Sequence, residues 1–133
     1  MPLSSNAQLV THIFDEVTRG NGAPFWDACA DTLVWRTIGH NSWSGEFRGK
    51  ATVIDEIFRP LRRRLATQAT IPTRIIDGGD IIVVQARGRN VTHTGLPYEN
   101  DYCFVIHFED GRIAHYEEYC DTELVTSILG ERA

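Results

Sequence analysis

The sequence lacks the short motifs that mark several large enzyme classes. It contains no HExxH, GxGxxG, GxxxxGK(S/T) or GxSxG segment. Zinc-dependent hydrolysis, dinucleotide binding, P-loop chemistry and an α/β-hydrolase nucleophile therefore have no support. Three histidines, His12, His93 and His107, fall in different predicted elements without the spacing of metal ligands. We therefore expect neither a metal nor a cofactor.

Cysteine is scarce, and long apolar runs and an excess of basic residues are absent. Cys29, Cys103 and Cys120 are odd in number and widely spaced, so neither a disulfide framework nor a CxxC metal site is indicated. No apolar run approaches the ~20 residues of a membrane helix, and residues 1–10 lack a signal-peptide pattern. We expect a cytoplasmic protein that binds no membrane. The net charge of -5 argues against nucleic-acid binding.

The length and the helical patterns are typical of one compact domain, residues 1–133. Apolar residues at three- and four-residue spacing, together with turn residues, predict helices at 5–19, 24–30, 50–67 and 122–129. Pro60 lies inside the long third helix, so we expect a kink or break near Phe58. The basic run Arg62 to Arg64 is predicted to lie on a solvated face of this helix.

Alternating and β-branched residues predict the strands. These are expected at 32–39, 70–76, 80–92, 100–108 and 112–120, with a polar loop at 40–49. Helices at one end followed by consecutive strands indicate an α+β fold, in which a bent antiparallel sheet wraps over the long helix.

The last predicted hairpin places a row of polar side chains on one face. If Asp110 and Gly111 form a two-residue turn, Phe108 lies opposite Ile113. The same face then carries Tyr102, Phe104, Ile106, His115, Glu117, Tyr119 and Asp121. This face is aromatic enough to be enclosed, although a β-bulge would reverse part of the assignment.

Three segments resemble the nuclear-transport-factor-2-like (NTF2-like) superfamily in its SnoaL-like branch, which includes ketosteroid isomerase, polyketide cyclases and limonene-epoxide hydrolase. They are VWRTIG at 34–39, GEFRGKATVIDEIF at 45–58 and FEDGRIAHYEEYCD at 108–121. The resemblance implies a cone-shaped α+β barrel that holds a small apolar ligand in an internal pocket. It also implies a homodimer formed through the outer face of the sheet.

Asp121 is the strongest candidate for acid/base catalysis. The resemblance to the cyclase and epoxide-hydrolase relatives implies this role for an aspartate near the end of the last strand. Tyr102, Tyr119 and apolar neighbours would raise the pKa of such a carboxylate into a useful range. The alternative is that Asp121 caps the helix predicted at 122–129.

Other candidates would hold the ligand, and Tyr102 and Phe104 of the hairpin face are two of them. Tyr119, Trp35 or His40 could hydrogen-bond a developing oxyanion, and Trp43 stands where relatives place pocket-lining groups. The alternatives are core packing for Trp35 and loop surface for His40 and Trp43.

Two relatives' signatures are incomplete in this chain. Arg87 is a candidate substrate-binding residue, but Arg89 stands where the epoxide-hydrolase relatives have an aspartate. The general base of the ketosteroid-isomerase relatives falls near Arg36, which is no base. The remaining candidates, His115 and Glu117, could share a proton in the site or form only a satisfied polar cluster.

The favoured hypothesis is a cofactor-independent isomerase, cyclase or lyase that acts on a small, largely apolar carbonyl compound. In it Asp121 moves a proton next to the carbonyl group. The competing hypothesis is a noncatalytic module of the same fold that binds a ligand or dimerises.

Overall fold

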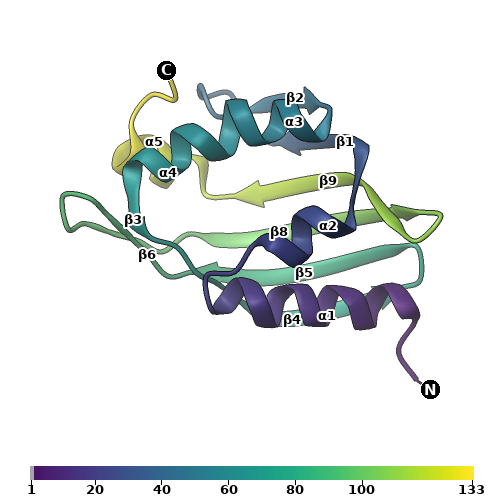
Figure 1. Cartoon of the computed structure of the whole chain (residues 1–133). Coiled ribbons are helices and arrows are strands. Elements are labelled where there is room, and N and C mark those ends of the chain that lie inside the picture. The colour runs from purple at the N-terminus through teal and green to yellow at the C-terminus, as the bar shows by residue number, and fades with distance from the viewer. Residues whose placement is uncertain (1) are drawn as a thin grey trace.

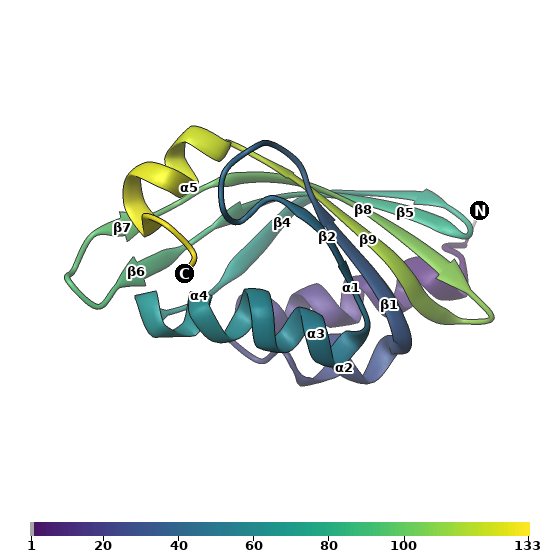
Figure 2. The ribbon, with the colours of Figure 1, turned by 90° about the horizontal axis from the view of Figure 1, so that it is seen from above.

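A computed structural model describes residues 2–133. Six strands form a mixed sheet in the order β2-β1-β9-β8-β5-β4, and three short strands form a second sheet in the order β3-β6-β7. Helices α1 to α4 lie against one face of the larger sheet, and α5 lies at its end (Figures 1 and 2). The elements are α1 (Ser5–Thr18), α2 (Ala23–Ala28), β1 (Cys29–Thr37), β2 (Gly45–Arg48), α3 (Lys50–Val53), the π-helical segment η1 (Ile54–Phe58), α4 (Arg59–Arg64), β3 (Leu65–Thr67), β4 (Thr70–Gly78), β5 (Ile81–Gly88), β6 (Asn90–Thr92), β7 (Pro97–Tyr98), β8 (Asp101–Glu109), β9 (Arg112–Cys120) and α5 (Thr122–Leu129).

The predicted α+β class is confirmed, and a helix forms in each predicted helical segment, although the third ends at Arg64 and residues 65–67 form strand β3. Three details of the strands differ from the prediction. The strand predicted at 80–92 divides into β5 and β6, and β6 belongs to the second sheet. β1 runs parallel to β9, so the sheet is mixed rather than antiparallel. Strand β2 forms inside the segment predicted as a loop. It was missed because it is a short edge strand in which only Phe47 is buried.

The long helix is irregular where Pro60 was predicted to disturb it. Regular helix α3 passes into η1 and then into α4. Pro60 has no backbone N–H to donate to the carbonyl oxygen of Glu56, and the Arg132 guanidinium donates to that oxygen instead, at 2.9 Å. The predicted irregularity near Phe58 is thus confirmed as a π-helical segment, a form common at functional sites.

A β-bulge in β9 decides which side chains of this strand face inward. Phe108 pairs with Ile113, but the next pair is His107 with His115, so Ala114 is an extra residue. Ile113 and Ala114 are accordingly both buried. Because successive side chains alternate between the two faces, one extra residue reverses the facing of the rest of the strand. The predicted inward row of His115, Glu117 and Tyr119 is therefore wrong.

The inner face of the sheet packs against the helices. The core between them is built from residues such as Phe14, Phe25, Trp35, Phe104 and Tyr116. In the part of the chain that is described, residues 2–133, no helix is long and apolar enough to cross a membrane.

Candidate functional site

A cavity of about 510 Å³ lies between the inner face of the sheet and the helices. This volume is within the range of small-molecule binding sites. Most of its wall is apolar and aromatic. The lining includes Ile13, Phe14 and Val17 of α1, Phe25 and Trp26 of α2, Ile57, Phe58, Leu61 and Arg62 of the long helix, Trp35, Thr37, Tyr102, Phe104, Tyr116, Glu118 and Cys120 of the sheet, and Trp43, Tyr98, Val125 and Leu129 beyond it.

Glu118 places a carboxyl group in this apolar cavity. It follows the bulge in β9 and lies opposite Phe104 of β8 and Thr37 of β1, both of which also line the cavity. Burial raises the pKa of Glu118 to about 7, because the low-polarity surroundings disfavour the charged form. Within residues 2–133, no donor hydrogen-bonds its side chain. The carboxyl group is therefore free to interact with a bound molecule.

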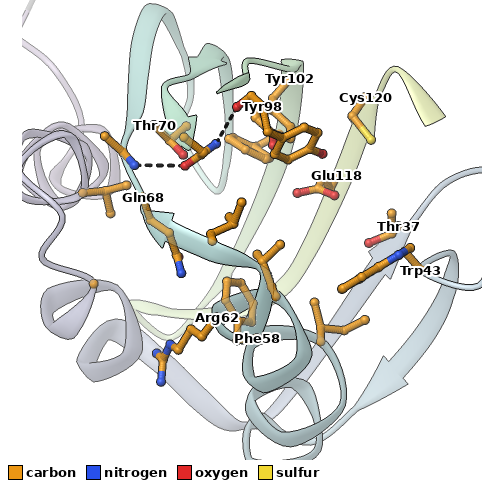
Figure 3. A pocket seen from close by; sticks show the side chains of 18 of the residues that line it. Thr37, Trp43, Phe58, Arg62, Gln68, Thr70, Tyr98, Tyr102, Glu118 and Cys120 are labelled. Atoms are coloured by element: carbon orange, nitrogen blue, oxygen red, sulfur yellow. Dashed lines mark hydrogen bonds between the residues drawn. The ribbon is translucent and has the colours of Figure 1, made fainter. Parts of the chain in front are cut away.

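Two phenols lie on the same side of the cavity as Glu118 (Figure 3). Tyr98 precedes β8, and Tyr102 stands within it. Burial is the main cause that raises the pKa of Tyr98 to about 12 and that of Tyr102 well above its ordinary value. Both hydroxyl groups therefore keep their protons at neutral pH, and the Tyr102 hydroxyl is directed toward that of Tyr98.

The fully buried Asn100 orients Tyr98. Its side-chain oxygen accepts from the backbone N–H of Asp121 at 3.0 Å, and its Nδ2 donates to the Asp121 carbonyl at 3.1 Å. These bonds fix which end of the amide is the donor. Nδ2 then also donates to the Tyr98 hydroxyl oxygen at 3.0 Å. Because this oxygen already accepts a bond from Asn100, the Tyr98 hydroxyl hydrogen is left to donate elsewhere.

Four of the predicted substrate-binding residues line the cavity. They are Trp35, Trp43, Tyr102 and Phe104. Trp35 stacks on Tyr116, with ring centroids 4.2 Å apart, and donates its indole N–H to the Thr37 hydroxyl oxygen at 2.9 Å. Its N–H is thus already bonded, and the indole contributes an apolar wall. Trp43 likewise donates its indole N–H to the Gly130 carbonyl.

Three predicted residues of β9 lie on the outer face of the sheet. Glu117 contacts Arg36 at 3.3 Å and His107 at 3.2 Å. Tyr119 donates to Glu117 at 3.3 Å, and His115 pairs with His107 in the β8–β9 ladder. Glu117 and His115 therefore do not form part of the cavity, and Tyr119 is separated from it by the sheet.

The other three predicted residues are also outside the cavity. Asp121 is exposed and caps α5, since its carboxylate accepts from the backbone N–H groups of Glu123 and Leu124, each at 3.1 Å. His40 is exposed in the β1–β2 connection. Arg87 forms a surface ion pair with Asp101. The helix-capping alternative for Asp121 is thus the one that its contacts support.

The polar groups that the sequence reasoning missed are Glu118, Tyr98 and Asn100. A strict alternation placed Glu118 on the outer face, and no pattern in the sequence marks Ala114 as a bulge. The segment around Tyr98 contains Gly95 and Pro97, which indicate a turn rather than a strand.

The described residues hold no group of three or more His, Cys, Asp or Glu side chains that could bind a metal ion.

The arrangement of a curved sheet around helices that enclose a cavity is the NTF2-like fold. A protein of unknown function from Burkholderia pseudomallei K96243 has this fold, with a TM-score of 0.82, 23% identity and coverage of 96% of this chain and 98% of that one. TerC, co-crystallized with polyporic acid, has a TM-score of 0.80 and 18% identity, covering 95% of this chain and 98% of its own.

The sequence comparison then gives the family. Residues 10–116 match the SnoaL-like domain, and this chain belongs to that family. The uncharacterized protein YesE of Bacillus subtilis strain 168 is 33% identical over 84 residues, which is 62% of this chain and 57% of YesE. This chain thus spans a little over half the length of that relative.

Proposed function

We propose that this protein catalyses proton transfer next to the carbonyl group of a small, largely apolar compound, as a cofactor-independent isomerase or cyclase. The observation that carries the proposal is Glu118, a carboxyl group without a hydrogen-bond donor in an aromatic cavity. Its pKa of about 7 lets it both take up and release a proton at neutral pH, which is what an efficient acid/base catalyst needs.

Glu118 would act as the base. Its carboxylate takes a proton from the carbon next to the carbonyl, the electron pair of that C–H bond forms an enolate, and the carboxylic acid returns the proton to the same or another carbon. Negative charge develops on the carbonyl oxygen during this step. The Tyr98 phenol supplies a neutral donor that would stabilise it, because Asn100 and Tyr102 interact with its oxygen and leave its hydrogen available.

The cavity supports the proposed substrate class. Its volume of about 510 Å³ suits a small molecule, and its walls are mainly apolar, with many aromatic side chains. The likeness to TerC, co-crystallized with polyporic acid, supports small-molecule binding in this fold. It does not by itself select the reaction.

The experiment is exchange of hydrogen for deuterium at the carbons next to the carbonyl of 2-tetralone, a small bicyclic ketone, followed by proton NMR in heavy water. The wild-type protein is expected to accelerate exchange over buffer. Glu118→Gln is expected to lower the catalysed rate by about 10²- to 10⁴-fold, because the amide keeps the shape of the side chain but cannot take the proton.

Glu117→Gln is the matched control, since it changes the neighbouring residue on the opposite face of the sheet. This variant is expected to keep the wild-type rate. Equal exchange by wild type and Glu118→Gln would refute the role of Glu118. Binding of 2-tetralone by the wild type without any accelerated exchange would favour the noncatalytic ligand-binding module instead.

A further inference from the structure

The mouth of the cavity can be placed from the exposure of its lining residues. Gly20, Arg62, Ala66 and Gln68 are the lining residues that are exposed. Gly20 follows α1 and lies against the backbone of Gln68, since a side-chain carbon added at Gly20 would be 3.4 Å from the Gln68 carbonyl oxygen. The mouth is therefore bounded by the α1–α2 turn, by α4 and by the chain around β3.

Arg62 is the charged group of this mouth. Among the described residues that line the cavity, Arg62 and Glu118 are the only charged ones, and Figure 3 shows them on opposite sides of it. Within residues 2–133, no carboxylate pairs with Arg62 and no carbonyl accepts from it. Two other arginines of α4 are engaged, Arg59 with Asp55 and Arg64 with the carbonyls of Pro60 and Leu129.

Building on the proposed function, we infer that the ligand is an elongated, largely aromatic compound with an acidic group, such as a carboxylate, at one end. The acidic group pairs with Arg62 at the mouth, and the opposite end lies beside Glu118. A guanidinium binds a carboxylate or sulfonate through two parallel hydrogen bonds while both stay partly hydrated at the rim. The reverse orientation would bury the anion in the apolar end of the cavity and place it next to Glu118, which costs desolvation and repulsion.

Two fluorescent dyes that differ only in a sulfonate test this inference. 8-Anilinonaphthalene-1-sulfonate is anionic, and N-phenyl-1-naphthylamine is the same molecule without the charge. Fluorescence titrations at neutral pH give the Kd of each dye. Arg62→Gln is expected to weaken binding of the sulfonate dye by about five- to tenfold, the effect of one charge-assisted contact at a partly exposed site, and to leave the neutral dye within twofold.

Arg63→Gln is the matched control, because it removes the same charge from the next residue, which does not line the cavity. It is expected to change neither Kd by more than twofold. The inference is overturned if the wild type does not bind the sulfonate dye, if Arg62→Gln leaves that Kd unchanged, or if both variants weaken it equally. Both arginines are exposed, so neither change threatens folding.

The dye titrations and the exchange experiment test the two proposals separately. If Arg62 selects the sulfonate dye but the wild type does not catalyse exchange of 2-tetralone, the anion site is supported and the proposed proton transfer is refuted. If exchange depends on Glu118 but Arg62→Gln has no effect on the dyes, only the acidic group of the ligand is refuted.

Discussion

Glu117 and Glu118 are consecutive residues of β9 whose carboxyl groups lie on opposite faces of the sheet. Outside, Glu117 contacts Arg36 and His107. Inside, Glu118 faces the aromatic cavity, and burial raises its pKa to about 7. The same chemical group is thus part of an ion-pair cluster at one position and is suited to proton transfer at the next, because only the second is held away from compensating charge.

Glu118→Gln is expected to stabilise the protein increasingly as pH rises. The unfolded chain releases the Glu118 proton near the ordinary pKa of 4.5, whereas the folded chain holds it up to about 7. Between these values the native state binds more protons, so the free energy of unfolding of the wild type falls as pH rises and then levels off. The variant escapes this loss, which is on the order of 3 kcal/mol above pH 7.

Urea unfolding at pH 4.5 and pH 8 measures this difference. The gap between Glu118→Gln and wild type is expected to be small at pH 4.5 and large at pH 8. Glu117→Gln, measured alongside, is expected to show no such gain. A gap of equal size at both pH values would contradict the assigned burial of Glu118.

The pH dependence of catalysed exchange gives a second prediction. The rate with 2-tetralone is expected to rise with pH and to reach a plateau above about 7, because the base is the ionised form of Glu118. The profile is followed by proton NMR across pH 5 to 9, with the buffer rate subtracted. A midpoint near 4.5 would instead indicate a carboxylate exposed to solvent.

Asp121→Ala is expected to reduce stability by about 1 kcal/mol without abolishing ligand binding, because it removes the N-cap of α5. Asp121→Asn is the control, since asparagine caps helices about as well as aspartate. Thermal unfolding and titration with N-phenyl-1-naphthylamine measure the two effects. A loss of exchange activity in Asp121→Asn at full stability would restore Asp121 as a catalytic candidate.

The uncovered face of the sheet leads to a prediction about assembly. Ile76, Val83 and Val105 pair in register across β4, β5 and β8 on this face, with Ile76 and the neighbouring Ile81 each 42% exposed. We expect two copies to pack through this apolar row, because an exposed apolar sheet surface of this kind is typical of an interface.

Val83→Lys tests this assembly by placing a charge in the centre of the row. Sedimentation velocity is expected to show a wild-type dimer and a dissociated variant. Leu96→Lys is the control, because Leu96 is an exposed apolar residue in the turn between β6 and β7. A wild type that is monomeric at all concentrations would disprove the dimer.

Much of the site could be predicted from local patterns, but its carboxyl group could not. Trp35 and Phe104 belong to strands with strong β propensity, and the burial of Phe104 follows from alternation along β8. Asp121 was recognised both as an acid/base candidate and as a possible cap, and its contacts support the cap. Whether Asp121 acts as a cap depends on the position of its carboxylate relative to the first backbone N–H groups of α5, and the residue type alone does not define that position.

The sequence by itself determined the helices, most of the strands, the α+β class and the SnoaL-like family, because these depend on apolar spacing and on local segments of the chain. The tertiary structure decided which face of β9 looks into the cavity. A single extra residue at Ala114, accommodated where β9 bends against β8, turned Glu118 inward and Glu117 outward. Side chains alternate with a period of two along a strand, so such a local bulge has no signature in composition yet reverses every position beyond it.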